Sequence, residues 1–273
     1  AYEIYQCDWS SDVCSSDLSF KAWSAVLMMA AASPSGAECT AVSGPQRLAL
    51  VELYTSEGCS SCPPADRWLS ALRKDKGLTE RIVPLAFHVD YWNKLGWIDP
   101  YAQPAFSERQ SIQSRRRGAS FVFTPQILVS GRDYRRGIVF DDFNRGVKAI
   151  NDSKPGASIR LEAARKPSGW AVALTSQLTG EVPAHAAQAF VAAYESVAAN
   201  TITAGENKGL TIAHDYVVRS LAGPFAFDDS GKLSVTDTLA PAARPGSSGY
   251  GIAAFVQDAR NGDVYQAVNR LCN

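Results

Sequence analysis

Two cysteines, Cys59 and Cys62, lie between a pattern typical of a buried strand and a helix that begins just after them. The apolar run at residues 48–54 predicts the strand. Pro63 and Pro64 fit only the first turn of a helix, where backbone N–H groups have no partner within the helix. One of the two serines between the cysteines is then the expected helix cap. Unpaired N–H groups and the helix dipole at such a turn stabilise a thiolate, which is the reactive form of cysteine.

The N-terminal segment contains two stretches that we expect to lie outside the fold. Residues 1–18 resemble the translation of a sequencing-library adapter, and such an artefact is left out of fold reasoning. The apolar run at residues 22–32 is too short to span a bilayer but typical of a secretory signal peptide. Residues 19–37 are therefore interpreted as a truncated signal peptide, with a buried helix as the alternative. We expect a periplasmic or secreted protein without a membrane span after cleavage.

Charge and cysteine usage restrict the partners and the redox compartment. The sequence holds 27 basic and 27 acidic residues, and this balance gives no argument for nucleic acid, which usually contacts a concentrated basic face. The sequence holds six cysteines, and those outside the adapter-like stretch form an even set, which favours disulfides in an exported protein. Cys39 and Cys272 lie near the two ends, and they either form a disulfide or stay unlinked thiols. The oligomeric state is left open.

The organisation of the chain changes at a Lys-Pro-Gly break at residues 154–156. Before it, residues 45–153 alternate apolar runs with amphipathic stretches, which predicts an α/β domain. After it, residues 157–273 consist of short alternating runs between Gly, Pro and Asp, which predicts a mostly antiparallel β-sandwich as a second domain. The first domain has further expected strands at residues 82–89 and 124–129, and expected helices at residues 100–117 and 140–150.

The order of strand, Cys-x-x-Cys, helix and a later Thr-Pro leading into a strand resembles the thioredoxin fold. In that fold the proline before the third strand has a cis peptide bond and packs against the cysteine pair, where it offers backbone edges to a substrate peptide. Pro125 matches this position, so the resemblance implies that Thr124 and Pro125 border the cysteines. An ordinary trans turn proline is the alternative.

Four stretches carry a narrower resemblance. They are residues 51–66 around the cysteines, His-Val-Asp-Tyr-Trp at residues 88–92, Leu-Gly-Trp at residues 95–97 and Phe-Thr-Pro-Gln at residues 123–126. Together they resemble a secreted bacterial family catalogued as domain of unknown function 1223, over nearly all of residues 48–271. That resemblance implies an α/β thioredoxin-like domain and export, and it implies no activity.

The chemistry that best fits the cysteine pair is thiol–disulfide exchange with a protein or small-molecule thiol or disulfide. Cys59 is the expected attacking thiol, being the more exposed of the pair, and Cys62 is the expected resolving thiol that closes the disulfide. Such exchange needs no cofactor, and the candidate enzyme is a thiol–disulfide oxidoreductase. The C-terminal domain then docks the partner or shields the site. One alternative is a non-catalytic envelope module with a structural disulfide.

Two further polar residues stand out near this pair. Glu52 lies inside an apolar strand, where an unpaired carboxylate is costly and its pKa rises, so it is a candidate to relay the proton of Cys62. An exposed strand end is the alternative. His88 ends the second expected strand, and with Cys59 and Cys62 it would make a ligand set for copper or zinc, as in a periplasmic copper-delivery protein. A solvent-facing or hydrogen-bonded histidine is the alternative.

Aromatic and basic residues complete the candidate site. Tyr91 and Trp92 either form a stacking or peptide-binding surface at its rim or cap the core. Arg116 either holds an anionic substrate or favours the thiolate, and a solvated helix end is the alternative.

Overall fold

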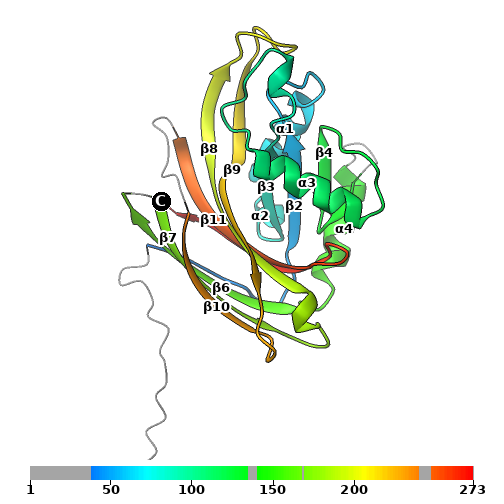
Figure 1. Ribbon diagram of the computed structural model, residues 1–273, viewed down its shortest axis with the longest axis vertical. Helices are drawn as coiled ribbons and strands as arrows, with labels where there is room; N and C mark the ends of the chain where they lie inside the picture. The colour runs from blue at the N-terminus through cyan, green and yellow to red at the C-terminus, as the bar shows by residue number, and fades with distance from the viewer. Residues whose placement is uncertain (1–37, 135–139, 168, 240–246, 273) are drawn as a thin grey trace, which may run out of the picture. The chain divides into compact units, whose positions relative to one another are not determined.

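Two β-sheets organise the chain in the computed structural model, which describes residues 38–134, 140–167, 169–239 and 247–272 (Figure 1). One sheet is antiparallel, with strand order β1-β6-β7-β10, and the other is mixed, with order β12-β11-β8-β9-β3-β2-β4-β5. The protein is therefore mostly β. The segments expected to be adapter-derived (1–18) and a truncated signal peptide (19–37) lie outside the described residues.

The elements follow the chain in this order: β1 (Cys39–Val42), β2 (Ala49–Thr55), α1 (Pro63–Ala71), η1 (Leu72–Lys74), α2 (Lys76–Thr79), β3 (Ile82–His88), η2 (Asn93–Leu95), α3 (Pro104–Arg116), β4 (Gln126–Val129), β5 (Arg132–Asp133), α4 (Phe140–Asn151), β6 (Ala157–Lys166), β7 (Gly169–Leu178), η3 (Ala184–Ala186), β8 (Ala187–Thr201), β9 (Thr211–Ala226), β10 (Lys232–Leu239), β11 (Ser247–Asp258) and β12 (Val264–Cys272). Of the helices among the described residues, none is both long and apolar enough to cross a membrane.

The first part of the mixed sheet confirms the expected strands. β2 and β3 are parallel and are joined through α1, as the apolar runs and the Pro-Pro helix start predict. Both strands are buried along their whole length, which explains their continuous apolar sequence. β4 then pairs antiparallel with β2, and β5 returns beside β4.

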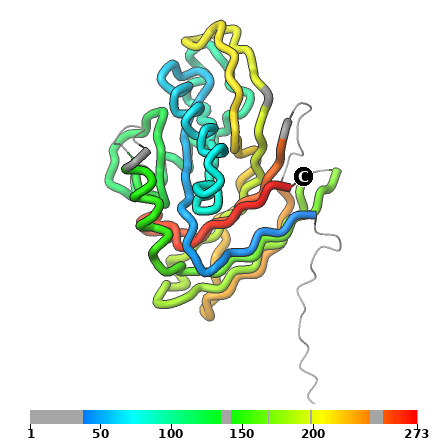
Figure 2. The backbone as a smooth tube through the Cα atoms, turned by 180° about the vertical axis from the view of Figure 1, so that it is seen from behind, coloured from blue at the N-terminus to red at the C-terminus, as the bar shows by residue number. Residues whose placement is uncertain are grey.

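Helices cover both faces of this part of the sheet. α3 crosses the face turned toward the viewer in Figure 1, whereas α1 lies on the face seen in Figure 2. On the first face, Phe106 of α3 packs edge-on against Phe87 of β3, at 5.3 Å between ring centroids. On the second, Trp68 of α1 meets Phe143 of α4 at 5.1 Å. Both faces of the central strands are thereby removed from water.

The second half of the chain extends the same sheet. β9 pairs in parallel with β3 at Ala86 and Val217, and β8, β11 and β12 continue from β9 as antiparallel strands. One sheet thus contains strands from both of the segments expected to be separate domains, 45–153 and 157–273. The limits of those domains stay a prediction.

Strand β8 shows how the two sheets pack, because its side chains alternate between two cores. Phe190, Ala192 and Tyr194 belong to the core shared with the helices. Ala189, Val191 and Ala193 belong to the core between the two sheets. Successive side chains of a strand point to opposite faces, so a strand with apolar residues at every position is one covered on both sides. Strand β8 is therefore covered by the helices on one side and by the antiparallel sheet on the other.

A disulfide between Cys39 and Cys272 joins β1 to β12 across a sequence separation of 233. It confirms the first of the two alternatives that the sequence leaves open for this pair. The bond links the first and last described strands, one from each sheet. A disulfide across so long a loop restricts the unfolded chain strongly.

Arg109 of α3 is a buried cation that links the two halves of the mixed sheet. It pairs with Glu52 of β2 at 2.8 Å and donates to the side-chain oxygen of Gln257 of β11 at 3.0 Å. Its guanidinium lies over the rings of Phe190 and Phe255, 4.9 and 4.8 Å from their centroids. The ion pair with Glu52 neutralises the charge of Arg109, and the two aromatic rings cover the guanidinium with their polarisable faces.

We expect Arg109→Met to destabilise the fold by about 3–5 kcal/mol, because it leaves the Glu52 carboxylate buried without its cation. The double variant Arg109→Met with Glu52→Leu removes both charges, so it should be more stable than the single variant. The measurement is the free energy of unfolding in urea. A double variant less stable than Arg109→Met alone would show that the unpaired Glu52 carboxylate does not cause the loss of stability.

Candidate functional site

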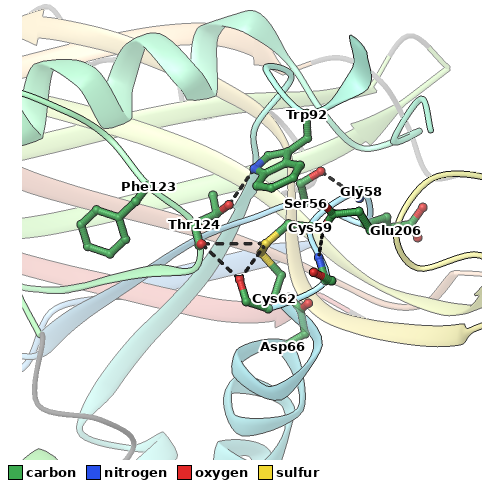
Figure 3. Close-up of a disulfide and its surroundings, with 12 residues drawn as sticks. Ser56, Gly58, Cys59, Cys62, Asp66, Trp92, Phe123, Thr124 and Glu206 are labelled. Carbon is green, nitrogen blue, oxygen red and sulfur yellow. Dashed lines mark hydrogen bonds between the residues drawn. A yellow bond between two sulfur atoms is a disulfide. The ribbon is translucent and has the colours of Figure 1, made fainter. Parts of the chain in front are cut away.

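The two cysteines of the turn between β2 and α1 form a disulfide (Figure 3). Cys62 is the residue that caps α1, and its N–H donates to the Cys59 carbonyl at 3.1 Å. The expectation that Ser60 or Ser61 caps the helix is wrong, because Pro63 is already the first helical residue. Both cysteines are 0% exposed, whereas Cys59 was expected to be the more exposed of the two. The turn therefore holds a covered disulfide.

The Thr-Pro segment before β4 lies against this disulfide, as the resemblance implied. Cys59 Sγ is 3.8 Å from the Thr124 carbonyl oxygen, and the hydroxyl of Ser61 donates to the same oxygen at 3.4 Å. The Thr124–Pro125 peptide bond is cis. The structure thus brings together Cys59, Cys62 and the Thr124–Pro125 unit.

Trp92 covers this meeting point from the loop after β3. Its indole N–H donates to the Thr124 hydroxyl at 2.7 Å, and Figure 3 shows the ring beside Cys59. The Tyr91 hydroxyl donates to Gln110 of α3 at 3.2 Å. Burial raises the pKa of Tyr91, and the hydroxyl lies close enough to the Thr124 side chain for that side chain to lower the pKa in part. The two aromatic residues expected at the rim, Tyr91 and Trp92, therefore both lie near the Thr124 side chain.

Three predicted residues have partners away from the cysteines. The Glu52 carboxylate accepts from Arg109 at 2.9 Å and from the Tyr54 hydroxyl at 3.1 Å. This contact with α3 places Glu52 on the face of the sheet opposite to α1, whose start carries the cysteines (Figures 1 and 2). Arg116 reaches Gln188 of β8 at 3.4 Å, and burial followed by the charge of Arg109 lowers its pKa.

His88 is the third of these residues. Its Nδ1 lies 2.7 Å from the Asp99 carboxylate, and its ring contacts the ring of His214 at 4.8 Å between centroids. Within the described part of the chain, no three His, Cys, Asp or Glu side chains gather as a metal-binding group. The expected set of Cys59, Cys62 and His88 is therefore not assembled. The alternative of a hydrogen-bonded histidine applies.

A buried carboxylate that sequence reasoning missed lies directly before the cysteine motif. Glu57 is 0% exposed, and its carboxylate accepts from Trp97 Nε1 at 2.9 Å and from Asn200 Nδ2 at 3.0 and 3.1 Å. Its backbone N–H donates to Asp99 at 2.8 Å. His214 Nε2 lies 3.2 Å from the same carboxylate. A charge removed from water requires such partners, and two of them come from β8 and β9.

His214 links Glu57 to a second carboxylate under the helix. Its Nδ1 is 3.8 Å from Asp66 of α1, which follows Cys62 by four residues and shares its face of the helix. Burial alone lowers the pKa of His214. The hydrogen bonds and charges of Asp66 and Glu57 outweigh this effect and raise the pKa to about 10. A buried imidazolium between two carboxylates therefore lies beneath the cysteine turn at neutral pH.

The β8–β9 loop, residues 202–210, holds the turn from outside. Asn207 is buried, and its amide donates to the carbonyls of Glu57 at 2.8 Å and Cys59 at 2.9 Å. The carboxylate of Glu206 accepts from the Ser60 N–H at 3.0 Å. A polar loop between two long apolar strands is visible in the sequence, but no local pattern connects it to a motif nearly 150 residues earlier.

We expect the stabilising effect of His214 to depend on pH. Its folded pKa of about 10 exceeds the unfolded value of about 6.5, so the contribution is complete below about pH 6.5 and is lost as pH rises through about 10. The variant His214→Gln keeps an amide at this position without the charge. The difference in unfolding free energy between wild type and variant should fall across this window.

The control is His185→Gln, which changes an exposed histidine in η3. Its difference from wild type should stay flat over the same pH range. A flat difference for His214→Gln as well would mean that its pKa is not raised in the folded protein.

The sequence matches the family model described as protein of unknown function (DUF1223) over residues 50–257. No curated protein matches the chain. An X-ray structure of a protein from Agrobacterium tumefaciens has 25% sequence identity and a TM-score of 0.56, and the match covers 84% of this chain and 96% of that one. HBP35 of Porphyromonas gingivalis has a TM-score of 0.62, 13% identity and coverage of 83% and 76% respectively, which shows the fold alone. Because the family match spans well over half of the sequence, this chain belongs to the DUF1223 family.

Proposed function

We propose that this protein exchanges thiols and disulfides through Cys59 and Cys62 on a protein or small-molecule partner. The observation that carries the proposal is the disulfide at the start of α1, with Cys59 Sγ 3.8 Å from the Thr124 carbonyl. Ser60 and Ser61, between the two cysteines, are exposed, so the covered sulfurs lie just beneath the surface. A partner therefore has a short path to Cys59.

The surrounding elements support a thioredoxin-like arrangement of this part of the chain. A parallel β2–α1–β3 unit is followed by the antiparallel pair β4 and β5 and by α4, and Thr124–Pro125 leads into β4. Export is part of the proposal, because stable disulfides such as Cys39–Cys272 form in oxidising compartments. The site would then act in the periplasm or outside the cell.

The proposed exchange balances without a cofactor. A partner thiolate attacks Cys59 Sγ, the Cys59–Cys62 bond breaks, and Cys62 leaves as a thiolate that takes up a proton. A second partner thiol loses its proton and attacks the partner's sulfur in the mixed disulfide, which releases Cys59. The partner dithiol has then become a disulfide and the cysteine pair a dithiol. The reverse sequence reduces a partner disulfide, with Cys62 as the resolving thiol.

We assign the proton of Cys62 to Asp66 in place of Glu52. Asp66 lies one turn after Cys62 on the same face of α1, is buried, and is drawn with the disulfide in Figure 3. Glu52 is held by Arg109 on the other face of the sheet. A buried carboxylate beside a thiol can accept its proton when the thiolate forms.

A second candidate function is a non-catalytic envelope module with a permanent disulfide. The observation in its favour is the complete burial of both cysteines. The two candidates differ in reduction potential, because structural disulfides resist reduction by glutathione and exchanging pairs do not.

We expect the reduced Cys62→Ser variant to accumulate a mixed disulfide at Cys59 when it is treated with oxidised glutathione. The wild-type protein should lose the adduct by closing its own disulfide, and Cys59→Ser, which lacks the attacking thiol, should form little adduct at Cys62. Intact-protein mass spectrometry after acid quenching measures the adduct. Equal labelling of the two single variants, or none in either, would favour the structural disulfide.

We expect Trp92→Ala to increase the rate at which dithiothreitol reduces the Cys59–Cys62 disulfide. The indole hydrogen bond to Thr124 must open for access, and the typical strength of one such bond corresponds to about a 2- to 12-fold faster rate. Trp92→Phe keeps a ring without the donor, so its rate should lie between wild type and Trp92→Ala. Thiol labelling against time measures the rates, and unchanged rates in both variants would show that Trp92 does not cover the site.

A further inference from the structure

The start of α1 offers few N–H groups to a thiolate. Pro63 and Pro64 have no N–H, and the N–H groups of Ala65 and Asp66 both donate to the Cys62 carbonyl, at 2.9 and 3.1 Å. The N–H of Cys62 itself is bound to the Cys59 carbonyl. A helix N-terminus stabilises an anion mainly through such groups, so the donors between the two cysteines matter more here than in an ordinary helix.

One of those remaining donors is occupied by a carboxylate from a distant part of the chain. The Ser60 N–H donates to Glu206 of the β8–β9 loop at 3.0 Å. Hydrogen bonding with the Ser60 side chain, followed by this backbone hydrogen bond, lowers the pKa of Glu206. The carboxylate is therefore ionised at neutral pH. It both removes a donor and places a negative charge beside the residue that follows Cys59.

The position of Glu206 is fixed by its neighbour. Asn207 is 3% exposed and donates to the carbonyls on either side of Gly58, those of Glu57 and Cys59. Because a buried amide with two backbone acceptors is costly to displace, the loop stays on the cysteine turn. On the inner side of the turn, the His214 cation lies between the carboxylates of Glu57 and Asp66, and the Asp99 carboxylate accepts from the Glu57 N–H. Glu206 adds a further negative charge on the outer side.

We propose that Glu206 disfavours the thiolate form of Cys59 and thereby stabilises the Cys59–Cys62 disulfide against reduction. The β8–β9 loop then sets the reactivity of the pair, because it carries the carboxylate that occupies the Ser60 N–H and adds the charge. This inference rests on the proposed function, since it concerns the reactivity of the same two sulfurs. Glu206 acts through Ser60, so it is a positioning residue.

The test is Glu206→Gln, which keeps an oxygen acceptor for the Ser60 N–H and removes only the charge. At a pH where Cys59 of the reduced protein is ionised, the equilibrium constant of the cysteine pair with dithiothreitol should shift toward the dithiol by about 2- to 5-fold, the range typical of a charge at a helix terminus. The thiolate absorbance of the reduced protein should appear at lower pH by the corresponding amount. Both shifts should shrink in high salt, because the Glu206 side chain is in contact with solvent.

The matched control is Glu181→Gln, an exposed carboxylate just before η3 and thus at the opposite end of β8 from the loop. A shift for Glu206→Gln that is no larger than for Glu181→Gln would overturn the proposal. This equilibrium is measured with dithiothreitol alone. It therefore reports on Glu206 even if Cys62→Ser traps no partner, so failure of the proposed function and failure of this inference can be told apart.

Discussion

The buried carboxylate of Glu57 is the constraint on which the site depends. Glu57 is 0% exposed. A buried carboxylate without hydrogen bonds or an opposite charge destabilises the folded state. Compensation for Glu57 comes from Trp97, from Asn200 of β8 and from His214 of β9. The cysteine turn therefore takes its position only when the long C-terminal strands are in place. This dependence makes the two halves of the chain one structural unit around the disulfide.

A second buried charge has the same effect at the other face of the sheet. Arg109 binds Glu52 of β2 and Gln257 of β11, so α3 holds together strands that are far apart in the sequence. The pair explains why a charged residue stands in an otherwise apolar strand. It also keeps Glu52 away from the cysteines, beneath which the buried carboxylates are those of Glu57 and Asp66 on either side of His214.

Local signals predicted the strands and helix of the first part of the fold, and a resemblance predicted the contact at the centre of the site. The Pro-Pro pair indicated a helix just after the cysteines, and the apolar runs predicted β2, β3 and β4. The resemblance to the thioredoxin fold implied that Thr124 borders Cys59. The partners of Glu57 could not be predicted in this way, because they follow it by 143 and 157 positions. Periodicity specifies which residues are buried but not which strand will lie beside them. That choice depends on side-chain pairing between distant segments, which a single sequence does not reveal.

The reactivity of the cysteine pair depends on how many N–H donors at the start of α1 remain for a thiolate. A helix terminus normally favours a thiolate, but here two prolines remove donors and Glu206 occupies another. Beneath the turn, the imidazolium of His214 is shared by Glu57 and Asp66, so little of its charge remains to stabilise a third anion. Trp92 and Thr124 cover the sulfurs from the remaining side. The missing and occupied donors disfavour a thiolate, and the cover by Trp92 and Thr124 limits access to the sulfurs. Access and the position of the β8–β9 loop, more than the helix dipole, would then decide when Cys59 reacts.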